Sequence, residues 1–79
     1  SREEISSTMD YQQRKQIKNK IRSIERKIED LESRKQEINE AFLKEGISTD
    51  DTIHLSKELG DINERIEALE TEWLELEDA

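Results

Sequence analysis

Apolar residues in the first half of the chain recur at alternating steps of four and three residues. They are Ile17, Ile21, Ile24, Ile28, Leu31, Ile38 and Phe42, with Lys35 in the one polar slot of the series. This alternation is typical of the a and d positions of a coiled-coil helix rather than of a general amphipathic face. The chain also contains no proline to interrupt it. We therefore predict one long helix, about residues 10–45, in which the Lys35 stem covers apolar surface while its ammonium group reaches water.

The second half repeats the same spacing. Its apolar residues are Leu55, Leu59, Ile62, Ile66, Leu69, Trp73 and Leu76, which predict a helix at about residues 52–78. Between the two runs lies GISTDD, residues 46–51. Gly46 suits the left-handed conformation that often ends a helix, and Ser48 to Asp51 are candidate N-cap residues for the next one. A turn is expected at residues 46–51.

Folding the second run back on the first pairs every apolar position without a break in register. The seven layers are Phe42 with Leu55, Ile38 with Leu59, Lys35 with Ile62, Leu31 with Ile66, Ile28 with Leu69, Ile24 with Trp73, and Ile21 with Leu76. Connections this short normally join antiparallel neighbours. The predicted fold is all-α, a two-helix antiparallel coiled-coil hairpin; a parallel dimer of either helix is the alternative. Trp73 either packs in this seam or is a handle for a partner.

The charges that flank the seam support the pairing only weakly. Lys27 lies near Glu72, and Lys18 near Glu77, which favours the hairpin. Two other predicted neighbours repel, Glu25 with Glu70 and Arg34 with Arg65. Exposed pairs contribute only about 0.2–1 kcal/mol each, so the apolar seam decides the pairing.

The start of the first helix is predicted at Asp10. Its side chain can cap the helix while Gln13 reaches back, which is a capping-box pattern. Residues 1–9 are polar and unpatterned, and we expect them to form a flexible linker at the edge of a domain excised from a longer protein. The hairpin domain is expected to span residues 10–79.

Charge is distributed unevenly along the chain. The net charge is −8, and charged residues make up 43% of the sequence. Residues 10–45 contain ten Lys and Arg against eight Asp and Glu, a balance of +2. Residues 46–79 contain two against eleven, a balance of −9, and residues 1–9 add −1. The first helix is therefore basic at its start, and the second helix is strongly acidic.

The sequence offers no recognisable catalytic site. It has no glycine-rich phosphate loop, no nucleophile elbow and no cysteine, and a two-helix hairpin is not expected to enclose a pocket. The single histidine, His54, has Asp50 one turn before it but no third ligand nearby, so a first-turn polar residue is favoured over a metal ligand. No apolar run approaches the ~20 residues that span a bilayer. We predict a domain that is not an enzyme and holds no metal or cofactor.

A basic stripe near the start of the first helix is the best candidate for function. The stretch RKQIKNKIRSIERK, residues 14–27, has seven positive residues against Glu25. Arg14, Lys18, Arg22 and Arg26 step by four, with Lys15 on the same side and Tyr11 at the start. Such a stripe is suited to following a phosphate backbone. An ordinary solvated coiled-coil face is an equally acceptable interpretation.

Three motifs together resemble the C-terminal coiled-coil domain of ABC-F ATPases, the Uup-like extension. DYQQRKQI, residues 10–17, matches the capped, Tyr-containing basic turn of the family, with Asp10 in place of the more usual Ser. LSKEL, residues 55–59, matches its L-x-x-E-L segment, and WLELE, residues 73–77, matches its closing signature. The resemblance covers about residues 10–78.

The resemblance implies a helical hairpin appended to a cytoplasmic, non-transporter ATP-binding protein that acts on ribosomes in translation. In Uup-like proteins this domain is associated with nucleic-acid binding, to DNA or ribosomal RNA. The implied contact residues are Tyr11, Arg14, Lys15, Lys18, Arg22 and Arg26. ATP and Mg²⁺ would belong to the absent parent domains, and the hairpin would be monomeric, with no membrane partner. The competing interpretation is a protein-interaction or spacer hairpin without nucleic-acid binding.

Overall fold

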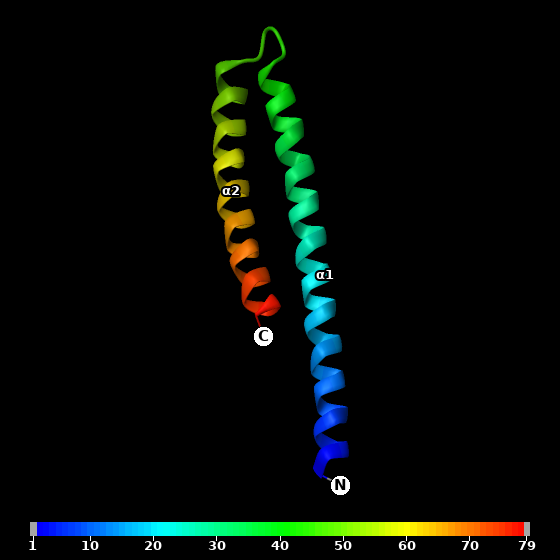
Figure 1. Ribbon diagram of the computed structural model, residues 1–79. Coiled ribbons are helices and arrows are strands. Elements are labelled where there is room, and N and C mark those ends of the chain that lie inside the picture. Colours follow the sequence, from blue (N-terminus) through cyan, green and yellow to red (C-terminus); the bar gives the residue numbers. More distant parts are fainter. Residues whose placement is uncertain (1, 79) are drawn as a thin grey trace.

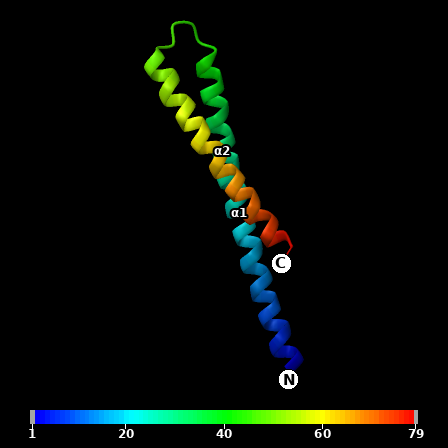
Figure 2. The same ribbon diagram turned by 90° about the vertical axis from the view of Figure 1, so that its left-hand side faces the viewer.

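The chain forms two helices, α1 (Arg2–Phe42) and α2 (Thr49–Glu77), joined by one short turn. The computed structural model describes the backbone of residues 2–78 and the side chains of residues 10–78. The helices run side by side in opposite directions (Figure 1), and they cross at a shallow slant (Figure 2). The result is a rod of about 70 × 15 × 14 Å. The predicted antiparallel hairpin is confirmed.

The first helix begins at Arg2, so the predicted start at Asp10 is wrong. Asp10 lies inside α1, and its carbonyl accepts a hydrogen bond from Arg14 Nε at 3.3 Å rather than closing a capping box with Gln13. No proline or glycine lies between Arg2 and Asp10 to stop the helix. The predicted linker at residues 1–9 therefore has a helical backbone from Arg2, while Ser1 lies outside the described residues.

The turn comes slightly earlier than predicted. After Phe42 the backbone tightens, because Leu43 N–H donates to Glu40 O at 3.1 Å and Lys44 N–H to Ala41 O at 3.2 Å. Gly46 then takes the expected left-handed conformation, with φ of 78°.

Ser48 caps the second helix, as one of the predicted candidates. Its Oγ accepts a hydrogen bond from Asp51 N–H at 3.0 Å. The Thr52 hydroxyl in turn donates to Ser48 O at 2.9 Å. Asp50 and Asp51 also place negative charge in the first turn, where the helix dipole favours it.

The seam predicted from the heptads is the core of the molecule. Ile24, Ile38, Ile62, Ile66 and Leu69 are buried, and the other predicted seam residues are half-buried. Ile38, Ile62 and Ile66 form a central cluster against which Ile28, Leu31, Phe42, Leu55 and Leu59 pack. Lys35 is half-buried in its a position, and Trp73 is half-buried in the seam. Trp73 is therefore a packing residue rather than part of an exposed tail.

One ion pair links the two helices across the seam. Arg34 was expected beside Arg65, but it binds Glu58, one heptad nearer the turn. Its Nε and Nη2 donate to the two carboxylate oxygens at 3.0 and 2.8 Å, and Nη1 donates to Glu37 at 3.0 Å. This two-point fork lowers the pKa of Glu58, because the hydrogen bonds from Arg34 favour the charged carboxylate.

The ion pair also shows which heptad positions of the two helices face one another. Arg34 precedes the a residue Lys35, and Glu58 precedes the a residue Leu59, so both occupy g positions. Because the two side chains form an ion pair, the g positions of the two helices face one another. Glu25 and Glu70 each follow a d residue, so they occupy e positions. Together with Trp73 they line one hollow, on the side of the hairpin opposite to the Arg34–Glu58 pair. The e positions therefore also face one another. One side of the hairpin is therefore formed by the e and b positions of both helices, and the other side by their g and c positions.

Truncation of a seam leucine should destabilise the hairpin far more than truncation of an exposed one. Leu69 is 1% exposed and Leu74 is 57% exposed, on the same helix. We expect Leu69→Ala to lower the free energy of unfolding by about 3 kcal/mol, and Leu74→Ala to change it by less than about 0.5 kcal/mol. Urea titration followed by circular dichroism measures both. Equal losses of unfolding free energy in the two variants would contradict the burial of Leu69 in the seam.

The stabilisation from the Arg34–Glu58 pair should depend on pH. Because the folded-state pKa of Glu58 is lower than its unfolded value near 4.3, this stabilisation is present at neutral pH and is lost as the pH falls through the folded pKa. We expect Glu58→Gln to lower the melting temperature at pH 7, with the difference from the parent disappearing in strong acid. Glu64→Gln, an exposed carboxylate on the same helix, is the control and should show no such difference. A Glu58→Gln effect that persists in strong acid would rule out this linkage.

Candidate functional site

Five of the six predicted contact residues lie around one open hollow on α1. The hollow, here called the basic hollow, is lined by Tyr11, Arg14, Lys15, Lys18, Asn19 and Arg22. All of these side chains are exposed, and Tyr11 is 64% exposed. Four of the six lining residues are cationic, so the hollow combines positive charge with one aromatic face.

Arg26, the sixth predicted residue, is exposed but does not line the hollow. The reason is the pitch of the helix. A step of four residues overshoots one turn of 3.6 residues by about 40°, so each member of the stripe lies further round α1 than the one before. By Arg26 the accumulated rotation is about 120°, which carries the side chain to a different face.

Asn19 is the lining residue that the sequence reasoning missed. It is four residues after Lys15 and next to Lys18, so helical spacing alone places it on the same side. The prediction counted only charged and aromatic residues along the stripe. A helical projection that included neutral polar side chains would have found it.

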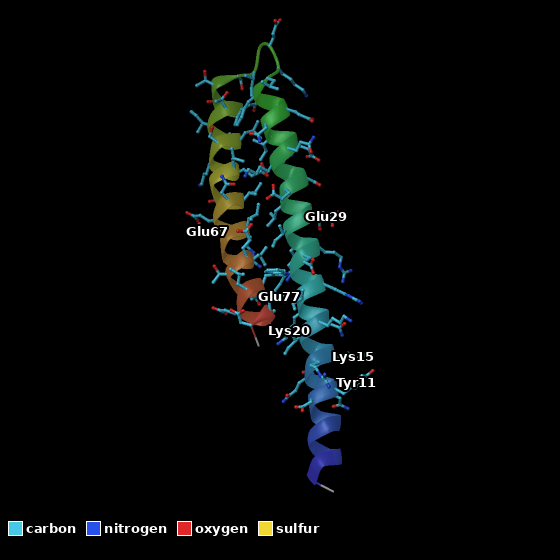
Figure 3. The ribbon with its side chains drawn as sticks, viewed as in Figure 1. Tyr11, Lys15, Lys20, Glu29, Glu67 and Glu77 are labelled. Atoms are coloured by element: carbon cyan, nitrogen blue, oxygen red, sulfur yellow. The ribbon has the colours of Figure 1, made fainter. Side chains whose placement is uncertain are left out.

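The basic hollow extends beyond the end of the acidic second helix. α2 ends at Glu77, and the last predicted layer pairs Leu76 with Ile21. The part of α1 before this layer therefore projects as a single helix, as Figure 1 shows. Tyr11 and Lys15 lie on this projecting part, below the level of Glu77 (Figure 3). In the register of the seam, Arg22 and Arg26 instead lie at the level of the last turns of α2.

The cations of the hollow are not engaged in ion pairs with other described side chains. Among residues 10–78, the ion pairs are those of Arg34 with Glu37 and Glu58. Arg14 directs its Nε to the Asp10 carbonyl, which leaves its other guanidinium nitrogens available. Among residues 10–78, no side chain therefore neutralises the positive charges of the hollow through an ion pair.

Two other hollows do not carry the chemistry of a site. One lies at the turn, where His54 and Asp51 lie beside Ala41 and Leu55. Among the described side chains, no three His, Cys, Asp or Glu residues gather where they could hold a metal ion. The other lies over Trp73 and Ile28, bordered by Glu25, Glu29 and Glu70.

Neither helix, over the residues described, is long and apolar enough to cross a membrane.

Comparison with known proteins places the chain in a family. Residues 8–78 match the family model described as the ABC transporter C-terminal domain. Searches of curated proteins and of solved structures each gave no match. The match covers almost the whole chain, begins close to the predicted boundary at residue 10, and confirms the resemblance noted in the sequence. The chain therefore belongs to the ABC transporter C-terminal domain family, the helical C-terminal domain of ABC-F-like proteins.

Proposed function

We propose that this hairpin is a non-catalytic domain of an ABC-F ATP-binding protein, and that its basic hollow contacts nucleic-acid phosphates. The observation that carries the proposal is the gathering of Arg14, Lys15, Lys18 and Arg22 in one open hollow. Phosphate contacts supply most of the affinity of proteins that bind nucleic acid without sequence preference. DNA and structured RNA, including ribosomal RNA, present the same phosphate chemistry.

The projection of α1 makes this contact compatible with an acidic protein. The second half of the chain has a net charge of −9, which repels a phosphate backbone. At physiological ionic strength, exposed charges are screened beyond about 8 Å. Because Tyr11 to Lys18 lie past the end of α2, a nucleic acid can approach them while it stays clear of the acidic helix. The contact is thus concentrated at the open end of the rod.

Tyr11 adds a second type of contact. It is exposed and lines the same hollow as the four cations. An aromatic ring beside a basic groove is suited to stacking against an unpaired base. The ATP-dependent chemistry, and engagement of the ribosome in the cytoplasm, would belong to the whole parent protein.

A salt titration tests the phosphate contacts. If all four cations contact phosphates, the logarithm of the association constant for a duplex should fall with the logarithm of the salt concentration, at a slope of about −3.6. Arg14→Gln combined with Lys18→Gln should weaken binding and make the slope shallower by about 2. Fluorescence anisotropy with a short DNA duplex, and separately with a ribosomal RNA hairpin, measures the slopes and shows which nucleic acid is preferred.

The matched control is Lys44→Gln with Lys57→Gln. It removes the same two charges from exposed positions at the other end of the rod. The control should leave the slope unchanged. Binding that is absent at low salt, or equal loss in both double variants, would reject the basic hollow and favour a spacer or protein-interaction hairpin.

The contributions of single cations should depend on their position along α1. Lys15 lies in the hollow, on the projecting part of α1 (Figure 3). Arg26 lies outside the hollow. We expect Lys15→Gln to reduce the salt slope by about 1, and Arg26→Gln to change it by much less. The same anisotropy assay compares the two single variants. Equal effects would show that the whole stripe binds, rather than the hollow.

A further inference from the structure

The outward face of the projecting part of α1 consists mainly of amide side chains. Gln12, Gln16 and Asn19 are exposed on this face, with Lys15 among them. Because successive residues of a helix are about 100° apart, these side chains lie within about 60° of Asn19 around the helix axis. The seam residue Ile17 lies about 160° from Asn19. The amide face, as we call these four residues, therefore points away from the side on which α2 packs.

Cations lie on both sides of the amide face. Lys18, which lines the basic hollow, is about 100° to one side of Asn19, and Lys20 is about 100° to the other side. Lys20 is exposed and does not line the hollow. Asp10 is the one acidic residue between positions 10 and 24, and it lies about 180° from Asn19. Positive charge thus borders the amide face on both sides, and the negative charge lies behind it.

We propose that the projecting part of α1 enters the major groove of B-form DNA. The amide face lies toward the base edges, while Lys18 and Lys20 reach the two phosphate strands that border the groove. The inference rests on the proposed function and names the nucleic acid and the way in which it is bound. A single phosphate strand lying in the basic hollow contacts only one side of the helix, whereas a groove between two strands contacts both.

The dimensions of a single helix fit this groove. An α-helix with its side chains is about 10–12 Å across, and the major groove of B-form DNA is about 12 Å wide. The major groove of A-form RNA is deep and too narrow for side chains to read. The fit therefore favours a DNA duplex over an RNA duplex.

The end of α2 limits the part of α1 that can enter the groove. α2 ends at Glu77, which is level with Lys20 in the register that pairs Leu76 with Ile21. From Lys20 onward, the acidic α2 lies behind α1 and brings carboxylates toward the phosphates. Before Lys20 the helix is single, as Figure 1 shows. The amide face lies on this single stretch.

Amide side chains have the chemistry needed for base contacts. An asparagine or glutamine amide both donates and accepts hydrogen bonds, and it matches the N6 and N7 atoms that adenine presents in the major groove. Asn19 is the central candidate, because Lys18 and Lys20 flank it equally. Gln12 lies two turns earlier at nearly the same angle, so it faces the same groove.

Fluorescence anisotropy at low salt tests the groove. The probes are a DNA hairpin with an alternating A·T stem, which presents adenine at every base pair, and its A·U counterpart in RNA. The DNA should bind at least about tenfold more tightly, because the RNA groove does not admit α1. Methyl green, which occupies the major groove, should displace the protein from the DNA, and netropsin, which occupies the minor groove, should not. Equal affinity for the two probes, or no displacement by methyl green, overturns the inference.

Lys20→Gln tests whether both phosphate strands are contacted. Because Lys20 lies on the side away from the basic hollow, its replacement should make the salt slope for the DNA shallower by about 1. Lys44→Gln, at an exposed position near the turn, is the control and should leave the slope unchanged. An unchanged slope in Lys20→Gln, with a shallower slope in Lys18→Gln, would leave the phosphate contacts of the hollow in place but reject entry into a groove.

Asn19→Ala tests the base contacts. Alanine favours the helix, and the change removes no charge, so the fold and the salt slope should be retained. We expect the affinity for the A·T stem to fall about tenfold. Asn39→Ala, an exposed asparagine of α1 near the turn, should change it by less than about twofold. Equal effects of the two changes would exclude base contacts by Asn19 and overturn the inference. Absence of binding to both probes would reject the proposed function as well.

Discussion

The fold depends on one continuous apolar seam between two helices. Its central residues, Ile38, Ile62 and Ile66, are buried, and the half-buried seam residues extend from them toward both ends. The residues that the structure describes form no other core, so burial along the seam must offset the ordering of a highly charged chain. Polar features refine this arrangement. The Ser48 cap sets the start of α2, and the exposed Arg34–Glu58 pair fixes neighbouring side chains rather than the pairing itself.

The unequal lengths of the helices set the basic hollow apart from the acidic helix. α1 has 41 residues and α2 has 29, and the excess of α1 lies at the open end. There the basic hollow extends away from the acidic helix, which suits a polyanion. Near the turn, the large apolar side chains of Leu43 and Ile53 are exposed.

The sequence predicted the seam and its register because heptad spacing reports directly on which residues face the partner helix. It misplaced the start of α1, because the capping pattern at Asp10 is local, whereas the helix continues wherever nothing stops it. It did not identify Glu58 as the ion-pair partner of Arg34, because the sequence offers two g positions of α2, Glu58 and Arg65, on the same side as Arg34. The basic stripe was visible in the sequence, but the separation of Arg26 from the hollow required the rotation of the helix in space.

The central functional claim is that nucleic acid contacts the projecting end of α1. Backbone amide chemical-shift mapping, in a titration with a short duplex or RNA hairpin at low salt, tests it most directly. We expect the largest shifts between Tyr11 and Arg22, with the buried seam unchanged. Shifts centred on the turn or on α2, with none between Tyr11 and Arg22, would contradict the claim.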